Sequence, residues 1–463
     1  MLVMRQEQEF MPSSAWLAAA VALWMAVWWA TEAIPVAATA LLPLAVFDPL
    51  GITSIREAAA PYANPIIFLY LGGFAMAVAL ERWGLHRRIA LAVIDNTGSN
   101  GRRLIAGFML VCAVLSMWMT NTSTTIMLLP IVFSVTAVIR DNVPNVTEQE
   151  RDNFQIAMLL GLAYAASIGG LATLIGTPPN ALLMGYMTEA YGVEISFAKW
   201  MLVGIPVSLT MLPITWLVLT RYLFPCNIPA SAEVSAHLRK LRSDMGAMSI
   251  AERRVAIVFS VLVLSWMFRQ PVTEWLALSG ISDTGIVITA ALILFILPSG
   301  NAENPRLMIW QDLSRLPWGV LILFGGGLSL AAAVSGSGLA LWLGEQLAPL
   351  NAWGIAVLVV GSVALVIFLT ELTSNLATTA TLLPVMGAIA VQAGVPPILL
   401  MVPITIAASC AFMLPVATPP NAIVFSTGVI SIPQMVRAGI FLNIIGIVIV
   451  SVVALMVAPR LFV

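Results

Sequence analysis

Apolar runs of about 20 residues recur along the whole chain, and no other feature constrains its fold as strongly. A helix of that length crosses the apolar core of a bilayer, which is about 30 Å thick. The runs do not alternate between polar and apolar residues, as the strands of a membrane barrel do. Charged residues make up only 9% of the chain, whereas a soluble domain carries about 25%. The sequence therefore predicts an all-α polytopic protein of the cell membrane, in contact with the lipid bilayer.

A polar stretch of the same pattern interrupts two of these apolar regions. Residues 120–125 read Thr-Asn-Thr-Ser-Thr-Thr, and residues 374–379 read Ser-Asn-Leu-Ala-Thr-Thr. Both are followed by an apolar segment that contains Leu-Leu-Pro at the same offset, so we infer a duplicated unit. Hydroxyl and amide groups can replace the water around a small ion inside a membrane. Each stretch is predicted to form the tip of a re-entrant hairpin. The arms are expected at residues 104–119 and 126–139, and at 355–369 and 381–391.

A second pair of motifs follows the two hairpins. Residues 176–180 read Gly-Thr-Pro-Pro-Asn, and residues 417–421 read Ala-Thr-Pro-Pro-Asn. Both motifs lie within apolar regions that are otherwise long enough to span a membrane. Two adjacent prolines remove two backbone donors from a helix, so each of these helices is predicted to be broken at its motif.

The other apolar regions are expected to cross the membrane as helices. In the first half the expected crossings are residues 14–30, 33–50, 65–80, 154–187 and 200–223. In the second half they are residues 255–267, 284–298, 318–334, 398–425 and 440–457. The polar segments 81–103 and 221–254 carry clusters of basic residues, which places them on the cytoplasmic side. Arg306 and Arg315, before the crossing expected at residues 318–334, mark the same side.

The number of crossings predicts that the two halves are inverted relative to each other. Each half has an odd number of crossings, so the first hairpin is expected to enter from the cytoplasm and the second from outside. If both arms of the first hairpin crossed fully, the polar loop 140–153 would lie outside instead, but the short arms favour the hairpin. Inverted hairpins that face broken helices are typical of a secondary transporter with alternating access, and not of an open channel.

The repeats also suggest a division of the chain into scaffold and transport parts. The expected parts are the N-terminal scaffold helices (1–103), the first hairpin and broken helix of the transport domain (104–199), the linking and scaffold helices (200–353, with the cytoplasmic loop 224–254), the second hairpin and broken helix (354–426), and the C-terminal helix (427–463).

Some residues in the apolar regions have two interpretations. The glycines at 72–73 and 325–327 are best interpreted as packing positions, because small residues allow helices to approach closely. Glu32 and Glu371 are intramembrane carboxylates, which are functional candidates. Each follows a Thr near an expected helix end, however, so a structural hydrogen bond is the simpler interpretation.

The remaining composition excludes several classes of function. The net charge of −1 and the scattered basic residues do not suit binding to nucleic acid. Cys112, Cys226 and Cys410 are isolated in the sequence, and His86 and His237 lie in polar connections. This inventory suggests neither a metal cluster nor a nucleophile with its base, so we do not expect an enzyme.

With four motifs in repeat order, residues 14–463 resemble the divalent anion/sodium symporter family, whose members carry dicarboxylates, citrate or sulfate. The resemblance rests on the Ser-Asn-Thr-type tips at 120–122 and 374–376 and the Thr-Pro-Pro-Asn loops at 177–180 and 418–421. It implies a homodimer whose transport domain, with both hairpins, moves as an elevator against a scaffold. It also implies sodium-coupled symport of a dicarboxylate such as succinate, or of citrate, with sodium as the coupling ion and no other cofactor.

The resemblance also implies a set of binding residues. The first sodium site would comprise Ser116, Thr120, Asn121 and Gly176. The second sodium site would comprise Thr370, Thr373, Asn375 and Ala417. The divalent anion would lie between the two sites, in contact with Asn121, Thr122, Thr177, Pro178, Asn375, Leu376, Thr418 and Pro419. The four motifs contain neither Arg nor Lys, so bound sodium would supply the positive charge that an anion needs inside a membrane.

The chain departs from the family pattern at three points. Thr120 replaces a Ser and keeps its hydroxyl, whereas Leu376 replaces a Thr and removes one hydrogen bond to a carboxylate. Most members of the family have one more hydrophobic helix before the region that corresponds to residues 14–30. Without that helix, the N-terminus is expected on the outside.

Two other transport activities remain open from the sequence. One is sodium-independent exchange of two dicarboxylates, and the other is sodium/sulfate symport. The residues of the tips do not determine the geometry of the anion by themselves.

Overall fold

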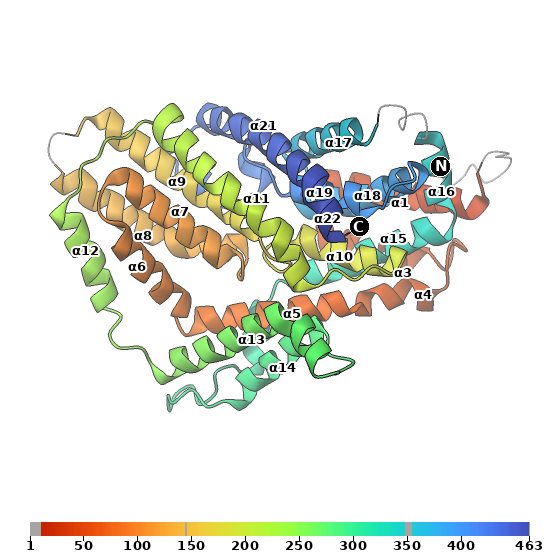
Figure 1. Cartoon of the computed structure of the whole chain (residues 1–463), viewed down its shortest axis with the longest axis horizontal. Coiled ribbons are helices and arrows are strands. Elements are labelled where there is room, and N and C mark those ends of the chain that lie inside the picture. The colour runs from red at the N-terminus through yellow and green to blue at the C-terminus, as the bar shows by residue number, and fades with distance from the viewer. Residues whose placement is uncertain (1–10, 144–145, 348–353, 463) are drawn as a thin grey trace.

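The structure is a computed structural model that describes residues 11–143, 146–347 and 354–462. Residue 353, where a domain boundary is expected, lies outside these ranges, as do residues 1–10 of the expected N-terminal scaffold. The regular elements in these ranges are helices, apart from an isolated β-bridge between Pro298 and Arg306 (Figure 1).

Up to residue 217, the described part of the chain contains eleven α-helices; two helical elements of other types and the linking helix α12 complete the first half. The α-helices are α1 (Ser13–Thr31), α2 (Val36–Thr39), α3 (Leu42–Val46), α4 (Ile55–Ala59), α5 (Pro65–Arg82), α6 (Leu85–Thr97), α7 (Gly101–Ser116), α8 (Asn121–Asn142), α9 (Glu148–Gly170), α10 (Pro178–Tyr191) and α11 (Phe197–Leu217). The 3-10 helix η1 (Ala60–Ala63) precedes α5, the π-helical η2 (Val218–Leu223) extends α11, and α12 (Ala232–Ser243) links the two halves.

The second half follows with a similar order of elements. Its α-helices are α13 (Ile250–Trp275), α14 (Asp283–Ile296), α15 (Trp318–Gly336), α16 (Leu339–Leu347), α17 (Ile355–Thr370), α18 (Asn375–Gln392), α19 (Ile398–Ala408), α20 (Pro419–Phe425), α21 (Ile432–Met456) and α22 (Ala458–Phe462). The 3-10 helices are η3 (Trp310–Arg315) and η5 (Pro415–Ala417).

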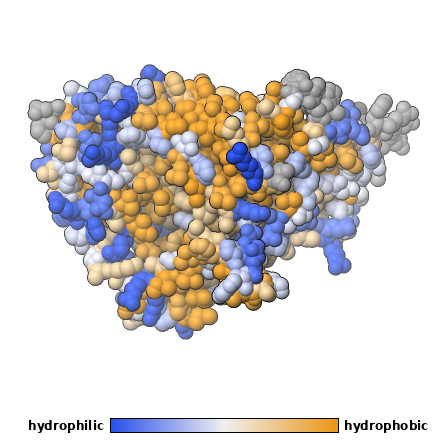
Figure 2. Space-filling view, in the orientation of Figure 1, coloured by the Kyte–Doolittle hydropathy of each residue, from blue (hydrophilic) through white to orange (hydrophobic). Residues whose placement is uncertain are grey.

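Nine helical segments within the described ranges are long and apolar enough to cross a bilayer. In Figure 2, hydrophobic residues cover much of the visible face between hydrophilic clusters at its left and right sides. The prediction of an all-helical membrane protein is therefore confirmed, and the chain is an integral, multi-pass membrane protein.

The crossing expected at residues 33–50 is wrong as a single helix. The region folds as two short helices, α2 and α3, because Pro35 and Pro43 lack the N–H groups that a continuous helix would need. The hydroxyl of Tyr62 donates a hydrogen bond to the carbonyl oxygen of Ala40, which lies between the two helices. A half-buried tyrosine thus satisfies an acceptor at the interruption.

The polar segments that were expected as loops contain two further helices, α6 and α12. Each buries apolar side chains on one face, and the two helices pack against each other. A ring nitrogen of His237 in α12 lies 2.6 Å from the hydroxyl oxygen of Ser134 in α8. The link between the two halves is therefore attached to the first helix pair.

The regions of the two expected hairpins fold as the helix pairs α7–α8 and α17–α18. Short turns at residues 117–120 and 371–374 join the helices of each pair. In Figure 1, α8 ends at the left of the molecule and α17 begins at its right, so the pairs extend from opposite ends. That each pair enters a membrane and turns back stays a prediction.

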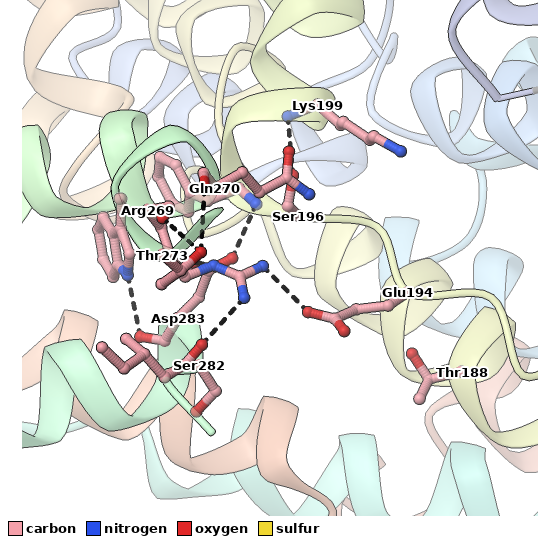
Figure 3. A network of polar contacts seen from close by, with 12 residues as sticks. Thr188, Glu194, Ser196, Lys199, Arg269, Gln270, Thr273, Ser282 and Asp283 are labelled. Carbon is pink, nitrogen blue, oxygen red and sulfur yellow. Dashed lines mark hydrogen bonds and ion pairs between the residues drawn. The ribbon is translucent and has the colours of Figure 1, made fainter. Parts of the chain in front are cut away.

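A polar network fastens the connection between α10 and α11 to α13 and α14 (Figure 3). The guanidinium of Arg269 lies 3.1 Å from a carboxylate oxygen of Glu194 and 2.7 Å from one of Asp283. The other oxygen of Asp283 accepts a 2.9 Å hydrogen bond from the backbone N–H of Phe197. The ring of Phe197 stacks on Trp266 of α13, with 4.2 Å between the ring centroids. Ion pairs and ring stacking therefore act together at this contact.

The glycines of α15 serve close packing, as expected. A Cβ atom at Gly326 would collide with the backbone of Ala40, and one at Gly325 would collide with the ring of Tyr62. These glycines let α15 lie directly against the interrupted segment that contains α2 and α3. The packing interpretation is confirmed for Gly72 as well, because its Cβ would lie 2.8 Å from the side chain of Val287.

We expect Gly326→Ala to lower the melting temperature of the purified protein, because the added methyl group must displace the Ala40 backbone. Overpacking of this kind costs about 1–3 kcal/mol. Gly336→Ala, at the end of the same helix, is the matched control, since its Cβ would meet open space. Equal melting temperatures for the two variants in a fluorescence-detected thermal assay would contradict this account of the α15 packing.

Candidate functional site

The four sequence motifs meet at one cavity of about 970 Å³. Both helix-pair turns and both broken-helix loops contribute to its lining, together with the end of α1 and the start of α15. The predicted binding residues that line it are Thr120, Asn121, Thr122, Gly176, Thr177, Pro178, Thr373, Asn375, Leu376, Ala417, Thr418 and Pro419. Residues separated by more than 250 positions in the sequence thus share one wall.

The two remaining predicted residues, Ser116 and Thr370, lie behind the cavity wall. The hydroxyl of Ser116 donates a 2.5 Å hydrogen bond to Oδ1 of Asn121. The hydroxyl oxygen of Thr370 lies 2.9 Å from Oδ1 of Asn375 and 2.8 Å from the carbonyl oxygen of Ala408. In both halves, the last residue of one helix therefore orients the amide of the asparagine that begins the next.

The turn at the first tip ends earlier in the chain than the sequence predicted. Helix α8 begins at Asn121, so most of the polar stretch 120–125 is helical, and Thr120 caps the helix by accepting the N–H of Ser123 at 3.1 Å. Thr125 donates its hydroxyl to the carbonyl oxygen of Asn121 within the same helix, at 2.8 Å. The second arm was expected to begin at residue 126 and begins instead at Asn121, because Thr side chains can bond back to their own helix.

Both helix breaks begin earlier than the proline motifs. The first runs over residues 171–177 and the second over residues 409–418, and Pro178 and Pro419 instead open the next helices. Proline suits this first position because its missing N–H would have no partner there anyway. The prolines thus mark the ends of the breaks and not their centres.

The two breaks approach each other next to the cavity. The hydroxyl oxygens of Thr177 and Ser409 lie 3.5 Å apart, although they belong to different halves. The hydroxyl of Tyr70 in α5 lies 2.7 Å from the carbonyl oxygen of Thr177 and also contacts that of Leu174. A helix of the expected scaffold therefore touches the first break directly.

Oxygen atoms of the first predicted sodium site converge around Gly170. A Cβ atom added to this glycine would lie 2.8 Å from Oδ1 of Asn121 and 2.9 Å from the carbonyl oxygen of Gly176. A side-chain amide oxygen and a backbone carbonyl oxygen are the kinds of ligand that a hard cation prefers. The residues present therefore suit a sodium ion.

Glu371 has a structural role in the second half. Its side chain is 3% exposed and accepts backbone N–H groups of Phe412 at 2.7 Å, Met413 at 2.9 Å and Leu414 at 3.1 Å. Asn443 of α21 donates a further hydrogen bond at 2.8 Å. The interpretation of Glu371 as a structural hydrogen-bond partner is confirmed, because one carboxylate satisfies donors that the broken helix leaves free.

Arg315 is a cavity residue that the sequence reasoning missed. Among the described residues that line the cavity it is the only Arg or Lys, and its guanidinium lies 3.2 Å from a carboxylate oxygen of Glu81. The sequence signal was a basic residue just before the apolar region of α15, which was interpreted only as a marker of the cytoplasmic side. Glu32, which directly follows the end of α1, also lines the cavity.

The three cysteines take no part in the cavity lining. Cys112, Cys226 and Cys410 are free and buried. Burial raises the pKa of the Cys226 thiol, in the connection before α12, to about 11. This thiol is therefore protonated at neutral pH and a poor nucleophile.

A family profile described as "Sodium:sulfate symporter transmembrane region" matches residues 3–463. The chain belongs to this family. It is 42% identical over 443 residues to the sodium-dependent dicarboxylate transporter SdcS of Staphylococcus saprophyticus, and 43% identical over 444 residues to SdcS of Staphylococcus aureus strain USA300. Each alignment covers 95% of this chain and 85% of the relative. The expected resemblance to the divalent anion/sodium symporters is thus confirmed.

Solved structures share the fold at low sequence identity. MtrF of Neisseria gonorrhoeae, described as one of a class of antimetabolite efflux pumps, gives a TM-score of 0.59 at 14% identity and covers 96% of this chain and 95% of its own. The YdaH transporter of Alcanivorax borkumensis gives a TM-score of 0.55 at 16% identity, with 96% and 98% covered. At these identities the likeness concerns the fold alone.

We expect Gly170→Ala to weaken sodium binding by about tenfold, because the methyl group would occupy the space between two oxygen atoms of the predicted sodium site. The measurement is a sodium titration of thermal stability in detergent, at constant ionic strength with potassium as the replacement ion. Gly161→Ala on the same helix is the control, since the atoms nearest to its Cβ would belong to the side chains of Met109 and Ile105, outside the predicted site. An unchanged sodium midpoint in Gly170→Ala would remove this glycine from the site.

Proposed function

We propose that this protein is a sodium-coupled symporter of a dicarboxylate such as succinate. The observation that carries the proposal is the convergence of four motifs on one cavity. The chain shares 42% and 43% identity with relatives that are named sodium-dependent dicarboxylate transporters, which supports the choice of ion and substrate. The proposed sodium ligands and anion contacts are those that the family resemblance implies.

The two tip asparagines can serve both a cation and an anion. Their Oδ1 atoms face Ser116 and Thr370, on the side of the proposed sodium sites. In the described part of the chain, the Nδ2 groups of Asn121 and Asn375 make no hydrogen bond, so they can donate to a carboxylate. Sodium bound on one side of the amide and substrate on the other would explain why transport of one requires the other.

Bound sodium would also lower the electrostatic cost of holding a dianion inside the membrane. A dicarboxylate inside a membrane is costly unless positive charge lies near it, and the four motifs supply no basic side chain. Arg315 lies at the cavity but is already paired with Glu81. Coupling to a cation would therefore provide the compensating charge, and the sodium gradient would drive accumulation of the substrate.

We further propose that the protein works as a homodimer with an elevator-like movement of the transport domain. The cavity extends to Arg315, which is expected on the cytoplasmic side, so we assign the structure to an inward-facing state. The network around Arg269 and Asp283 joins the connection before α11 to α13 and α14, and would have to open when the transport domain moves. The proposed domain boundaries are those expected from the sequence.

Sodium/sulfate symport is the second candidate, because the description of the family names sulfate. A cavity of about 970 Å³ can hold either anion, so the preference for a dicarboxylate rests on the relatives that are named dicarboxylate transporters. Sodium-independent exchange is the third candidate, and it would leave the oxygen atoms around Gly170 without a cation. Competition of succinate uptake by citrate and by sulfate distinguishes the substrates.

We expect Asn121→Ala and Asn375→Ala each to reduce sodium-driven succinate uptake to background, because each removes one sodium ligand and one anion donor. The measurement is uptake of labelled succinate in membrane vesicles, normalised to folded protein by size-exclusion chromatography. Asn96→Ala is the control, since this exposed asparagine bonds only the carbonyl oxygen of Ala92 in its own helix. Normal uptake in either tip variant would disprove the proposed site.

A further inference from the structure

A buried asparagine side chain bridges the first helix break. Asn180 is the third residue of α10 and is 0% exposed. Its Nδ2 group donates hydrogen bonds to the carbonyl oxygens of Gly170 at 3.2 Å and Thr173 at 2.7 Å. Gly170 is the last residue of α9, so one amide group joins the end of one half-helix to the start of the next.

The second break has an asparagine at the equivalent position, and both of its acceptors lie within the break, beyond the end of α19. Asn421 is the third residue of α20 and is also 0% exposed. Its Nδ2 group donates to the carbonyl oxygens of Ala411 at 3.2 Å and Leu414 at 3.1 Å. The acceptors lie ten and seven residues before the asparagine in both halves. The same spacing therefore occurs twice, once in each half of the chain.

Each asparagine fixes the turn that ends in a proposed sodium ligand. The carbonyl oxygen of Thr173 also accepts the N–H of Gly176 at 3.4 Å. The carbonyl oxygen of Leu414 likewise accepts the N–H of Ala417 at 3.2 Å. Gly176 and Ala417 are the residues of the breaks that are assigned to the two sodium sites. A shift of the turn would thus move the carbonyl group that faces the ion.

The amide oxygens of these two asparagines have no hydrogen-bond partner in the described part of the chain. Within the described ranges, Oδ1 of Asn180 and Oδ1 of Asn421 are buried without a hydrogen-bond partner. A buried acceptor without a donor is unfavourable. Its presence at both positions indicates that the two N–H donors, and not the oxygen, are what each break requires.

We propose that Asn180 and Asn421 are positioning residues, each of which presets one sodium site by holding the backbone carbonyl groups of its break in place. This inference rests on the proposed sodium coupling and assigns a role to the last residue of both Thr-Pro-Pro-Asn motifs. A preformed ring of ligands costs less reorganisation when the ion binds. Loss of either asparagine should therefore weaken sodium binding and leave the maximal rate at saturating sodium intact.

The test uses Asn180→Leu and Asn421→Leu in the full-length protein. Leucine has the same number of side-chain heavy atoms as asparagine, and it removes the donors without adding charge. The expected result is a rise of about tenfold in the sodium midpoint, both for succinate uptake and for thermal stabilisation by sodium alone. At saturating sodium, the uptake rate should approach that of the unmodified protein. Asn142→Leu, at an exposed asparagine near the end of α8, is the control and should change neither value.

Several outcomes would overturn the inference. An unchanged sodium midpoint in folded Leu variants would remove the positioning role, and a fall in maximal rate alone would assign the asparagines to the movement. If the Leu variants do not fold, Asn180→Ala and Asn421→Ala replace them. Loss of folded protein in all four variants would make the residues purely structural. Absence of any sodium effect in the unmodified protein would instead refute the proposed function.

Discussion

The site depends on backbone groups that two interrupted helices leave without intrahelical partners. Inside a membrane no bulk water can satisfy such groups, so the protein must supply partners itself. It does so with a small set of buried side chains: Tyr70 and Asn180 at the first break, and Glu371 and Asn421 at the second. With these contacts made, other carbonyl groups of the breaks are free to face a cation.

The two halves connect the break to the residue before the tip with different hydrogen-bonding groups. Met117 and Glu371 occupy equivalent positions before the tips, and Thr173 and Leu414 occupy equivalent positions in the breaks. In the first half, the hydroxyl of Thr173 donates to the carbonyl oxygen of Met117 at 2.5 Å. In the second half, the N–H of Leu414 donates to the carboxylate of Glu371 at 3.1 Å. The donor is a side chain in the first half and a backbone N–H in the second, and the acceptor changes from a backbone carbonyl to a side-chain carboxylate. At this position, a carboxylate is therefore present beside the second break and not beside the first.

The sequence predicted the order of the motifs, the helical class and 12 of the residues that line the cavity, because repeated polar groups in apolar regions have few other uses. It did not predict that Asn121 already begins α8, since a Thr hydroxyl can bond either to its own helix or to a ligand. It also did not predict that Pro35 and Pro43 divide a crossing, since the contact between Tyr62 and Ala40 forms only on folding. Arg315 was missed because only folding brings the start of α15 to the cavity.

Sodium-driven uptake of labelled succinate into proteoliposomes tests the central claim most directly. The liposomes receive an inward sodium gradient, an equal potassium gradient, or internal succinate without either gradient. The account predicts accumulation above equilibrium with sodium, and only slow equilibration with potassium. Uptake that requires internal succinate and is indifferent to sodium would contradict it, and would identify an exchanger in place of a symporter.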